Sequence, residues 1–111
     1  MRETLARTPR FAERVFTEPE RAYCEGRGVV AAQHYAARFA AKEAFLKALG
    51  TGWRDGIAWH DVAVANHDDG RPFLVITGQA REIYENLGAN AAHLSLSHTA
   101  EHAIAQVVLE K

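Results

Sequence analysis

The pattern of apolar and polar residues along the chain predicts four short strands. The segments either alternate apolar with polar residues or are mostly apolar, and both patterns are typical of half-buried β-strands. They are residues 61–66, 72–77, 92–97 and 103–109. A polar loop joins the first two segments and another joins the last two, and the first of these loops contains Gly70. We therefore expect two antiparallel hairpins.

Four other segments carry the signals of helices. They are residues 2–7, 17–25, 30–49 and 79–87. The second begins with a capping box of Thr17 and Glu20, and the third ends at Gly50, a residue type that commonly follows the last helical turn. The fourth places four apolar residues on one face: Ala80, Ile83, Tyr84 and Leu87. Helices followed by strand pairs predict an α+β fold, in which an antiparallel sheet packs on the long, alanine-rich central helix.

The composition is that of an ordinary globular protein. The chain has 111 residues, of which 48% are hydrophobic and 24% charged, and this length suits one domain with one modest core. No apolar stretch approaches the roughly 18 residues of a membrane span, and the first residues lack the apolar core of a signal peptide, so we expect a cytoplasmic protein. The single cysteine, Cys24, cannot form an internal disulfide, and we expect a buried or idle thiol.

The net charge of −1 is divided unevenly between the two halves. Residues 1–50 hold nine Lys and Arg against six Glu, whereas residues 51–111 hold four Lys and Arg against eight Asp and Glu. A basic half suits an acidic partner, although an ordinary solvated surface explains so small a difference equally well. Nucleic acid is disfavoured as a partner because no dense stripe of Lys and Arg with interleaved aromatic residues occurs.

Glu43 and Lys47 are the first candidates for a functional site. They lie one turn apart on the long predicted helix, at the border of an apolar stripe formed by Tyr35, Phe39 and Leu46. A carboxylate at such a border suits Mg²⁺, and a lysine one turn away supplies a positive charge for phosphate. The alternative is an ordinary ion pair between residues four apart on a solvated face.

A second candidate is Ser97-His98-Thr99, at the end of the third predicted strand. Hydroxyls, an imidazole and free backbone N–H groups at a strand end can bind phosphate, and the alternative is a role in stabilising the turn. Neighbouring strand residues face opposite sides, so Ser97 and His98 are poorly placed for a nucleophilic triad. The six histidines have no spacing that fixes a zinc geometry, and we interpret Gly50-Thr51-Gly52 first as a helix C-cap.

Taken in order, five segments make the chain resemble the bacterial holo-acyl-carrier-protein synthases, the small trimeric branch of the 4′-phosphopantetheinyl transferases. The segments are Arg10 to Thr17, Arg38 to Lys47, Gly50-Thr51-Gly52, Gly70-Arg71-Pro72 and Leu94 to Thr99. The resemblance implies transfer of 4′-phosphopantetheine from coenzyme A to a serine of acyl carrier protein, with release of 3′,5′-ADP. It also implies the 4′-phosphopantetheinyl transferase fold, a homotrimer and a place in fatty acid biosynthesis.

The resemblance assigns the metal site to Glu43. It implies Mg²⁺ as the cofactor with Glu43 as a ligand, and it implies that Lys47 contacts the phosphates of coenzyme A. Glu43, a bound water or another group would remove the proton of the carrier serine, and these alternatives stay open.

The remaining assignments concern the two substrates. By the same resemblance Arg38, the Gly50-Thr51-Gly52 loop and Ser97-His98-Thr99 line the coenzyme A site. Arg10 and Arg14 face the acidic helix of the carrier protein.

One feature of the family has no counterpart in this sequence. Family members begin with a strand of the type Gly-Ile-Asp, whose aspartate is the second Mg²⁺ ligand, and no aspartate of this chain has that context. We therefore interpret residues 1–111 as an N-terminally truncated domain. Two alternatives to an enzyme follow: a module that binds coenzyme A or carrier protein without catalysis, and a plain α+β interaction domain in which Glu43 and Lys47 form a surface pair.

Overall fold

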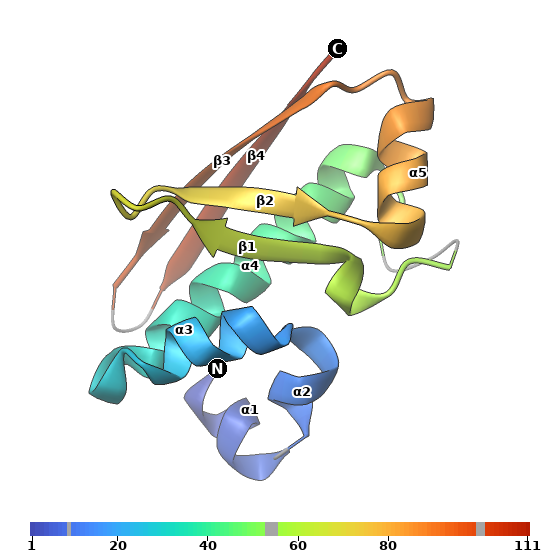
Figure 1. Ribbon diagram of the computed structural model, residues 1–111. Helices are drawn as coiled ribbons and strands as arrows, with labels where there is room; N and C mark the ends of the chain where they lie inside the picture. The colour runs from blue at the N-terminus through green and yellow to red at the C-terminus, as the bar shows by residue number, and fades with distance from the viewer. Residues whose placement is uncertain (9, 53–55, 100–101) are drawn as a thin grey trace.

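The computed structural model describes residues 1–8, 10–52, 56–99 and 102–111. The helices are α1 (Arg2–Arg7), α2 (Phe11–Val15), α3 (Glu18–Glu25), α4 (Ala31–Leu49) and α5 (Gly78–Asn86). The strands are β1 (Val62–Asn66), β2 (Pro72–Ile76), β3 (Ala91–His98) and β4 (Ala103–Glu110). Short 3₁₀ turns precede α4 and β1, at Gly28–Val30 and Trp59–Asp61. In Figure 1, α4 crosses the middle of the molecule, with α1 and α2 at one end and α5 at the other.

The predicted elements are confirmed with shifts of one or two residues at their ends. The capping box at the start of α3 is present: the backbone N–H of Thr17 donates to Glu20 Oε1 at 2.9 Å, and that of Glu20 donates to Thr17 Oγ1 at 3.4 Å. Gly50 ends α4 with φ 83°, a left-handed conformation that favours glycine. Sequence reasoning did not find α2, because five residues are too few for a helical period to be recognised.

The strands form two separate antiparallel ladders in place of one continuous sheet. In β1–β2, Val64 is opposite Leu74, and in β3–β4, Ser95 is opposite Gln106. β2 and β3 contact each other, but no ladder of hydrogen bonds joins them among the described residues. The predicted α+β fold is confirmed, and the expected sheet is divided between two hairpins that pack on α4.

Two apolar clusters lie along α4. The first contains Phe45 and Leu46 of α4, which pack with Val62 and Tyr84. The second contains Tyr35 of α4 with other buried residues at the N-terminal end, among them Phe16 and Cys24. Because α4 contributes to both clusters, it connects the N-terminal helices to the strands.

Cys24 and Leu87 differ in burial. Cys24 is fully buried and burial raises the pKa of its thiol to about 11, so the predicted buried thiol is confirmed. Leu87 caps the end of α5 and is 41% exposed. No helix in the described part of the chain is long and apolar enough to span a membrane.

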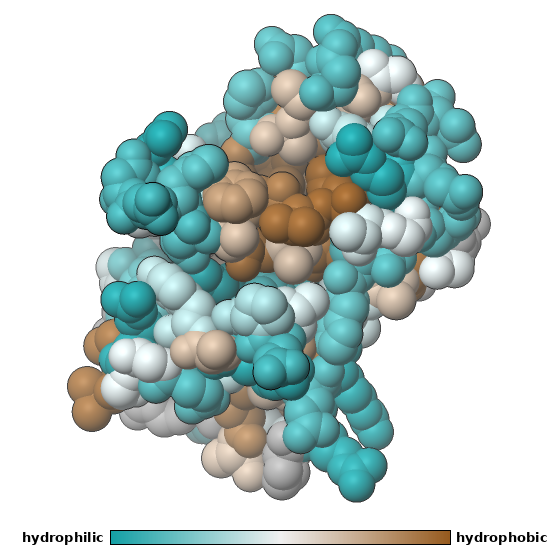
Figure 2. Space-filling view, in the orientation of Figure 1, coloured by the Kyte–Doolittle hydropathy of each residue, from teal (hydrophilic) through white to brown (hydrophobic). Residues whose placement is uncertain are grey.

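The outward face of the β1–β2 hairpin is apolar. Val64 is buried, and strand alternation therefore directs Ala63, Ala65, Phe73 and Val75 to the opposite face. Figure 2 shows a hydrophobic area framed by polar residues on the side where this hairpin faces the viewer.

Candidate functional site

A shallow groove of about 390 Å³ between α4 and β4 contains Glu43 and Lys47, the first two candidate site residues. It is lined by small apolar residues, one larger one and two charged ones: Ala40, Ala44, Ala103, Ala105, Ile104, Glu43 and Lys47. Residues three and four apart share a helix face, so Glu43 and Lys47 stand on the α4 wall together. The alanines on both walls let helix and strand approach closely, which keeps the two charged groups next to an apolar strand.

Glu43 and Lys47 differ in exposure and are not paired. Glu43 is half-buried and Lys47 is exposed. Within the described ranges they make no ion pair with each other, and Glu43 has no hydrogen bond from its side chain. A half-buried carboxylate with its oxygens uncommitted can bind a hard cation, which takes one or two carboxylates and completes its shell with water and substrate oxygens.

Arg38 lies on a different side of α4 from this groove. At about 100° per residue it is roughly half a turn from Lys47. Its side chain is 2% exposed, its Nη2 donates to Asn66 Oδ1 at 2.5 Å, and its guanidinium lies 4.1 Å from the ring centre of Tyr23. The Nε atom of Arg38 is buried without a hydrogen-bond partner. The structure therefore does not bring Arg38 together with Glu43 and Lys47 within one chain.

The three residues at the end of β3 diverge as strand alternation requires. Ser97 is exposed on one face, whereas His98 is half-buried on the other. The ring of His98 meets that of His34 of α4 edge-on, with ring centres 4.9 Å apart, and its Nδ1 is buried without a partner. Thr99 pairs with His102: its N–H donates to the carbonyl of His102 at 2.8 Å, and its Oγ1 accepts from the N–H of His102 at 3.2 Å.

The ring of His34 contacts both His98 and Tyr23, and with Arg27 and Arg38 these residues form a cluster of basic and aromatic side chains that sequence reasoning missed. Tyr23 stacks with Arg38 and also with Arg27, whose guanidinium lies 4.3 Å from its ring centre, and its edge contacts His34. Burial lowers the pKa of His34, and the positive charges of His98, Arg38 and Arg27 lower it further. These residues come from three elements, so no local pattern in the sequence could have indicated the cluster.

The Gly50-Thr51-Gly52 segment caps α4. The N–H of Gly50 donates to the carbonyls of Leu46 and Lys47, and that of Thr51 donates to Leu46. Gly50 and Gly52 both have positive φ. The C-cap interpretation is confirmed for Gly50, and the cap places this segment directly after the turn that carries Lys47.

Arg10 and Arg14 are both exposed at α2. Figure 1 shows α2 at the end of the molecule away from α5. Both arginines are therefore exposed to solvent near that end of the molecule. No cluster of three or more His, Cys, Asp or Glu side chains suited to a metal occurs among the described residues.

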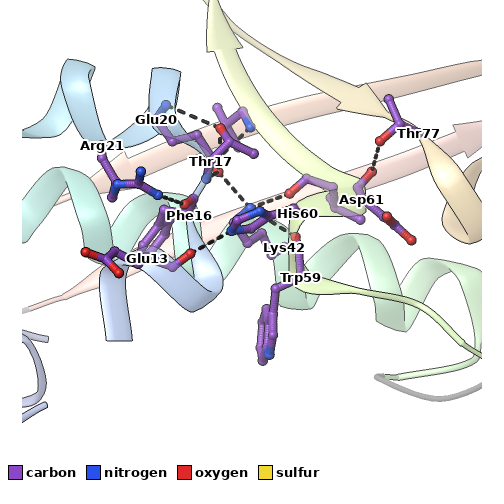
Figure 3. A network of polar contacts seen from close by, with 12 residues as sticks. Glu13, Phe16, Thr17, Glu20, Arg21, Lys42, Trp59, His60, Asp61 and Thr77 are labelled. Atoms are coloured by element: carbon purple, nitrogen blue, oxygen red, sulfur yellow. Dashed lines mark hydrogen bonds and ion pairs between the residues drawn. The ribbon is translucent and has the colours of Figure 1, made fainter. Parts of the chain in front are cut away.

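Lys42, next to Glu43 in sequence, forms a buried ion pair that sequence reasoning did not predict (Figure 3). Its ammonium donates to Glu20 Oε1 at 2.8 Å, to the carbonyl of Trp59 at 3.4 Å and to the carbonyl of Val62. Lys42 and Glu20 are 0% and 1% exposed. Burial lowers the pKa of Lys42, and the charge of Glu20 opposes that shift. One signal in the sequence could have indicated this pair. The predicted helix has almost no polar face around position 42, so a lysine there cannot reach solvent and needs a buried partner.

The comparisons with known proteins decide the family. The model of the 4′-phosphopantetheinyl transferase superfamily matches residues 1–107. The chain belongs to this superfamily. A curated superfamily member, the holo-[acyl-carrier-protein] synthase of Trichlorobacter lovleyi, is 56% identical over 97 residues, which are 87% of this chain and 76% of that protein.

Solved structures agree with this membership. The holo-[acyl-carrier-protein] synthase of Neisseria meningitidis has a TM-score of 0.85 at 31% identity, covering 99% of this chain and 87% of that one. The synthase of Bacillus anthracis, solved in complex with coenzyme A (3′,5′-ADP), has a TM-score of 0.77 at 38% identity, covering 97% and 86%. As a phosphopantetheinyl transferase, the chain is an enzyme of the transferase class with the α+β fold predicted from its sequence.

Proposed function

We propose that this chain transfers the 4′-phosphopantetheine group from coenzyme A to a serine hydroxyl of acyl carrier protein. The serine oxygen bonds to the phosphorus that carries pantetheine, the bond from that phosphorus to the bridging pyrophosphate oxygen breaks, and 3′,5′-ADP leaves. The observation that carries the proposal is the superfamily match over residues 1–107, which includes the groove with Glu43 and Lys47. The reaction loads carrier proteins for fatty acid synthesis.

Glu43 holds Mg²⁺ in this proposal. Its half-buried carboxylate has no competing ion pair in the described part of the chain, and one carboxylate with several waters and phosphate oxygens is an ordinary Mg²⁺ shell. When bound, the ion offsets the negative charge of the coenzyme A pyrophosphate. The base that accepts the serine proton is Glu43, directly or through a water, or another group, and general bases contribute about 10²–10⁴-fold.

Coenzyme A meets two groups of residues. Lys47 supplies a mobile positive charge to its phosphates, and the Gly50-Thr51-Gly52 segment offers backbone next to it. Arg38 and Ser97-His98-Thr99 form the second group, in which Arg38 Nε and His98 Nδ1 are buried donors or acceptors without a protein partner. The two groups lie on different sides of α4, which supports a coenzyme A site completed by a second copy of the chain.

A homotrimer supplies that second copy. Ile104 and Val108 are 67% and 53% exposed and lie four residues apart on the outward face of β4, where an interface would cover them. Light scattering of the chain and of an Ile104→Asp/Val108→Asp variant tests this assembly. A Leu87→Asp variant, which changes an exposed leucine directly after α5, should keep the parent mass, and a monomeric parent would reject the trimer.

Arg10 and Arg14 receive the carrier protein, and the compartment is the cytoplasm. Both arginines are exposed on a surface of their own, as a docking site for an acidic helix requires. The buried thiol of Cys24 is compatible with a reducing compartment.

A titration with coenzyme A, with and without Mg²⁺, followed by a transfer assay on apo-acyl carrier protein, tests the proposal. The experiment uses this chain and an extended chain, in which about 15 residues carrying a Gly-Ile-Asp strand precede residue 1, enough for a strand of about five residues and a helical lead. Mg²⁺-dependent transfer supports the enzyme. Binding without transfer in both forms would indicate a binding module, and the absence of both would indicate a plain interaction domain.

A further inference from the structure

The buried pair of Lys42 and Glu20 joins three elements at one point. Glu20 Oε1 accepts from Lys42 Nζ at 2.8 Å and from the N–H of Thr17 at 2.9 Å, and Oε2 accepts from the N–H of Val64 at 2.9 Å. Lys42 adds bonds to the carbonyls of Trp59 and Val62. The start of α3, the middle of α4 and the start of β1 thus meet around one ammonium and one carboxylate, as Figure 3 shows for Glu20, Thr17, Lys42 and Trp59.

Apolar packing alone specifies the rotation of α4 about its own axis only weakly. Eight of the 19 residues of α4 are alanines distributed around the helix. Large buried residues of α4 restrict its rotation, with Tyr35 in the N-terminal cluster and Phe45 and Leu46 in the cluster next to the strands, but apolar contacts are not directional and leave small rotations open. Lys42 differs, because its three acceptors have fixed positions and no solvent can replace them.

The rotation of α4 matters for its neighbour in sequence. Glu43 is about 100° around the helix from Lys42 and faces the groove to β4. Side-chain ends lie roughly 6 Å from a helix axis, so a turn of about 10° moves the Glu43 carboxylate by about 1 Å, a displacement that can cost about 10²-fold in rate. Lys47 moves with it.

We infer that Lys42 and Glu20 are positioning residues, which fix the axial rotation of α4 and thereby aim Glu43 and Lys47 into the groove. The expected effect on catalysis rests on the proposed function, whereas the expected effect on the rotation of α4 does not. Burying an ion pair is a poor source of stability, because desolvation opposes the attraction of the charges. The ion pair instead orients α4, and we call this role of Lys42 and Glu20 the anchor. A neutral pair of similar volume would preserve the fold but would no longer fix the rotation of the helix.

The test compares a Glu20→Gln/Lys42→Met double variant with the parent. Gln at position 20 retains an oxygen that can cap α3, and Met fills the volume of the lysine stem, so the thermal midpoint should stay within a few degrees of the parent. NOEs between alanine methyl groups report the rotation, because Ala40 and Ala44 of α4 share the groove with Ala103 and Ala105 of β4. We expect these NOEs to weaken and others from α4 to appear.

Catalysis provides the second readout. In the extended chain the double variant should lose about 10-fold or more in kcat for transfer, by the displacement argument above, while the KM for carrier protein, which docks at α2, stays at the parent value. A matched control, Arg81→Met/Glu85→Gln, removes an exposed ion pair of 3.1 Å on α5 and should change neither readout.

The outcomes separate this inference from the proposed function. Parent NOEs together with a parent kcat in the double variant would overturn the positioning role. If the NOEs change in the double variant while the parent itself shows no transfer activity, the positioning role is supported and the proposed function is rejected. If the double variant does not fold, the single variant Glu20→Gln replaces it. The same alanine-methyl NOEs should change in this variant, and NOEs identical to those of the parent would contradict the positioning role.

Discussion

Glu43 and its neighbour Lys42 have opposite surroundings although they are adjacent in sequence. Lys42 is fully buried with three acceptors, whereas Glu43 is half-buried with no described partner. A carboxylate without a partner at the edge of a groove contributes little to folding, so removing its charge should leave stability unchanged. The functional and the structural residue can therefore be separated by substitution.

Glu43→Gln in the extended chain should lower Mg²⁺-dependent transfer by roughly 10²–10³-fold, the usual loss when a group that stabilises transition-state charge is removed. The amide keeps the shape of the side chain and loses its charge, so the thermal midpoint should not change. Steady-state kinetics at saturating Mg²⁺ provide the measurement, and Glu82→Gln, an exposed position on α5, is the control. Near-parent turnover of Glu43→Gln would show that the metal assignment is wrong.

Lys47→Met should weaken coenzyme A binding more than it weakens the fold. An exposed helical charge contributes a few tenths of a kcal/mol at most, about 0.2–0.5. A hydrogen bond to a charged phosphate contributes about 1.5–3 kcal/mol, so the Kd should rise about 10- to 100-fold. Isothermal titration and thermal melts decide the matter, and equal losses in both would return Lys47 to a merely structural role.

His34 gives the fold a dependence on pH. Burial and the nearby positive groups lower the pKa of His34 in the folded state below its ordinary value of 6.5, so the unfolded chain takes up a proton more readily. The contribution of neutral His34 to the free energy of unfolding is therefore complete above about pH 6.5 and is lost as the pH falls below that value. His34→Gln should therefore lose less stability than the parent between about pH 7.5 and about pH 5.5. The exposed His102→Gln is the control in thermal melts, and parallel losses in parent and His34→Gln would contradict the prediction.

At the scale of elements, α2 and β4 present different surfaces. Arg10, directly before α2, and Arg14 within it are both exposed, whereas β4 packs against α4 and leaves Ile104 and Val108 largely exposed. A polar surface of this kind steers an encounter, and an apolar one favours a lasting contact. This difference supports the proposal that the carrier protein docks at α2 and that copies of the chain assemble through β4.

Arg10→Glu/Arg14→Glu should raise the KM for acyl carrier protein and leave coenzyme A affinity at the parent value. Charges at the rim of an interface act mainly on association, so the increase in KM should be larger at low ionic strength. Kinetics at two salt concentrations with carrier protein as the varied substrate provide the test. An unchanged KM at low salt would remove these arginines from the docking surface.

At the scale of the whole molecule, β4 has an unpaired edge. It pairs with β3, and no other strand among the described residues hydrogen-bonds to it. An edge strand exposes unpaired N–H and C=O groups, and the adjacent groove contains Glu43 as its only described carboxylate. A further strand that adds both backbone partners and an aspartate would complete the ladder and the Mg²⁺ shell.

The extended chain should therefore have a higher thermal midpoint and faster Mg²⁺-dependent transfer than residues 1–111 alone. Melting curves, light scattering and the transfer assay on both forms check this. Equal activity of the shorter form would mean that another carboxylate supplies the second ligand and would contradict the interpretation of residues 1–111 as a truncated domain.

The sequence determined the local elements of this protein. The Thr17–Glu20 capping box, the terminal Gly50 and the alternating strand residues act over a few neighbours, so their outcome did not depend on the rest of the chain. The spacing of Glu43 and Lys47 put them on one helix face for the same reason. The ordered motifs were also sufficient to indicate the superfamily.

Only the tertiary structure decided which distant residues meet. Arg38 meets Tyr23 of α3 and Asn66 of β1 because these elements pack on its side of α4. Glu20 pairs with Lys42, 22 positions later in the sequence, and both side chains are buried. Such contacts depend on how the helices and hairpins cross, and because no local period records that geometry, the pattern of residues along the chain could not predict them.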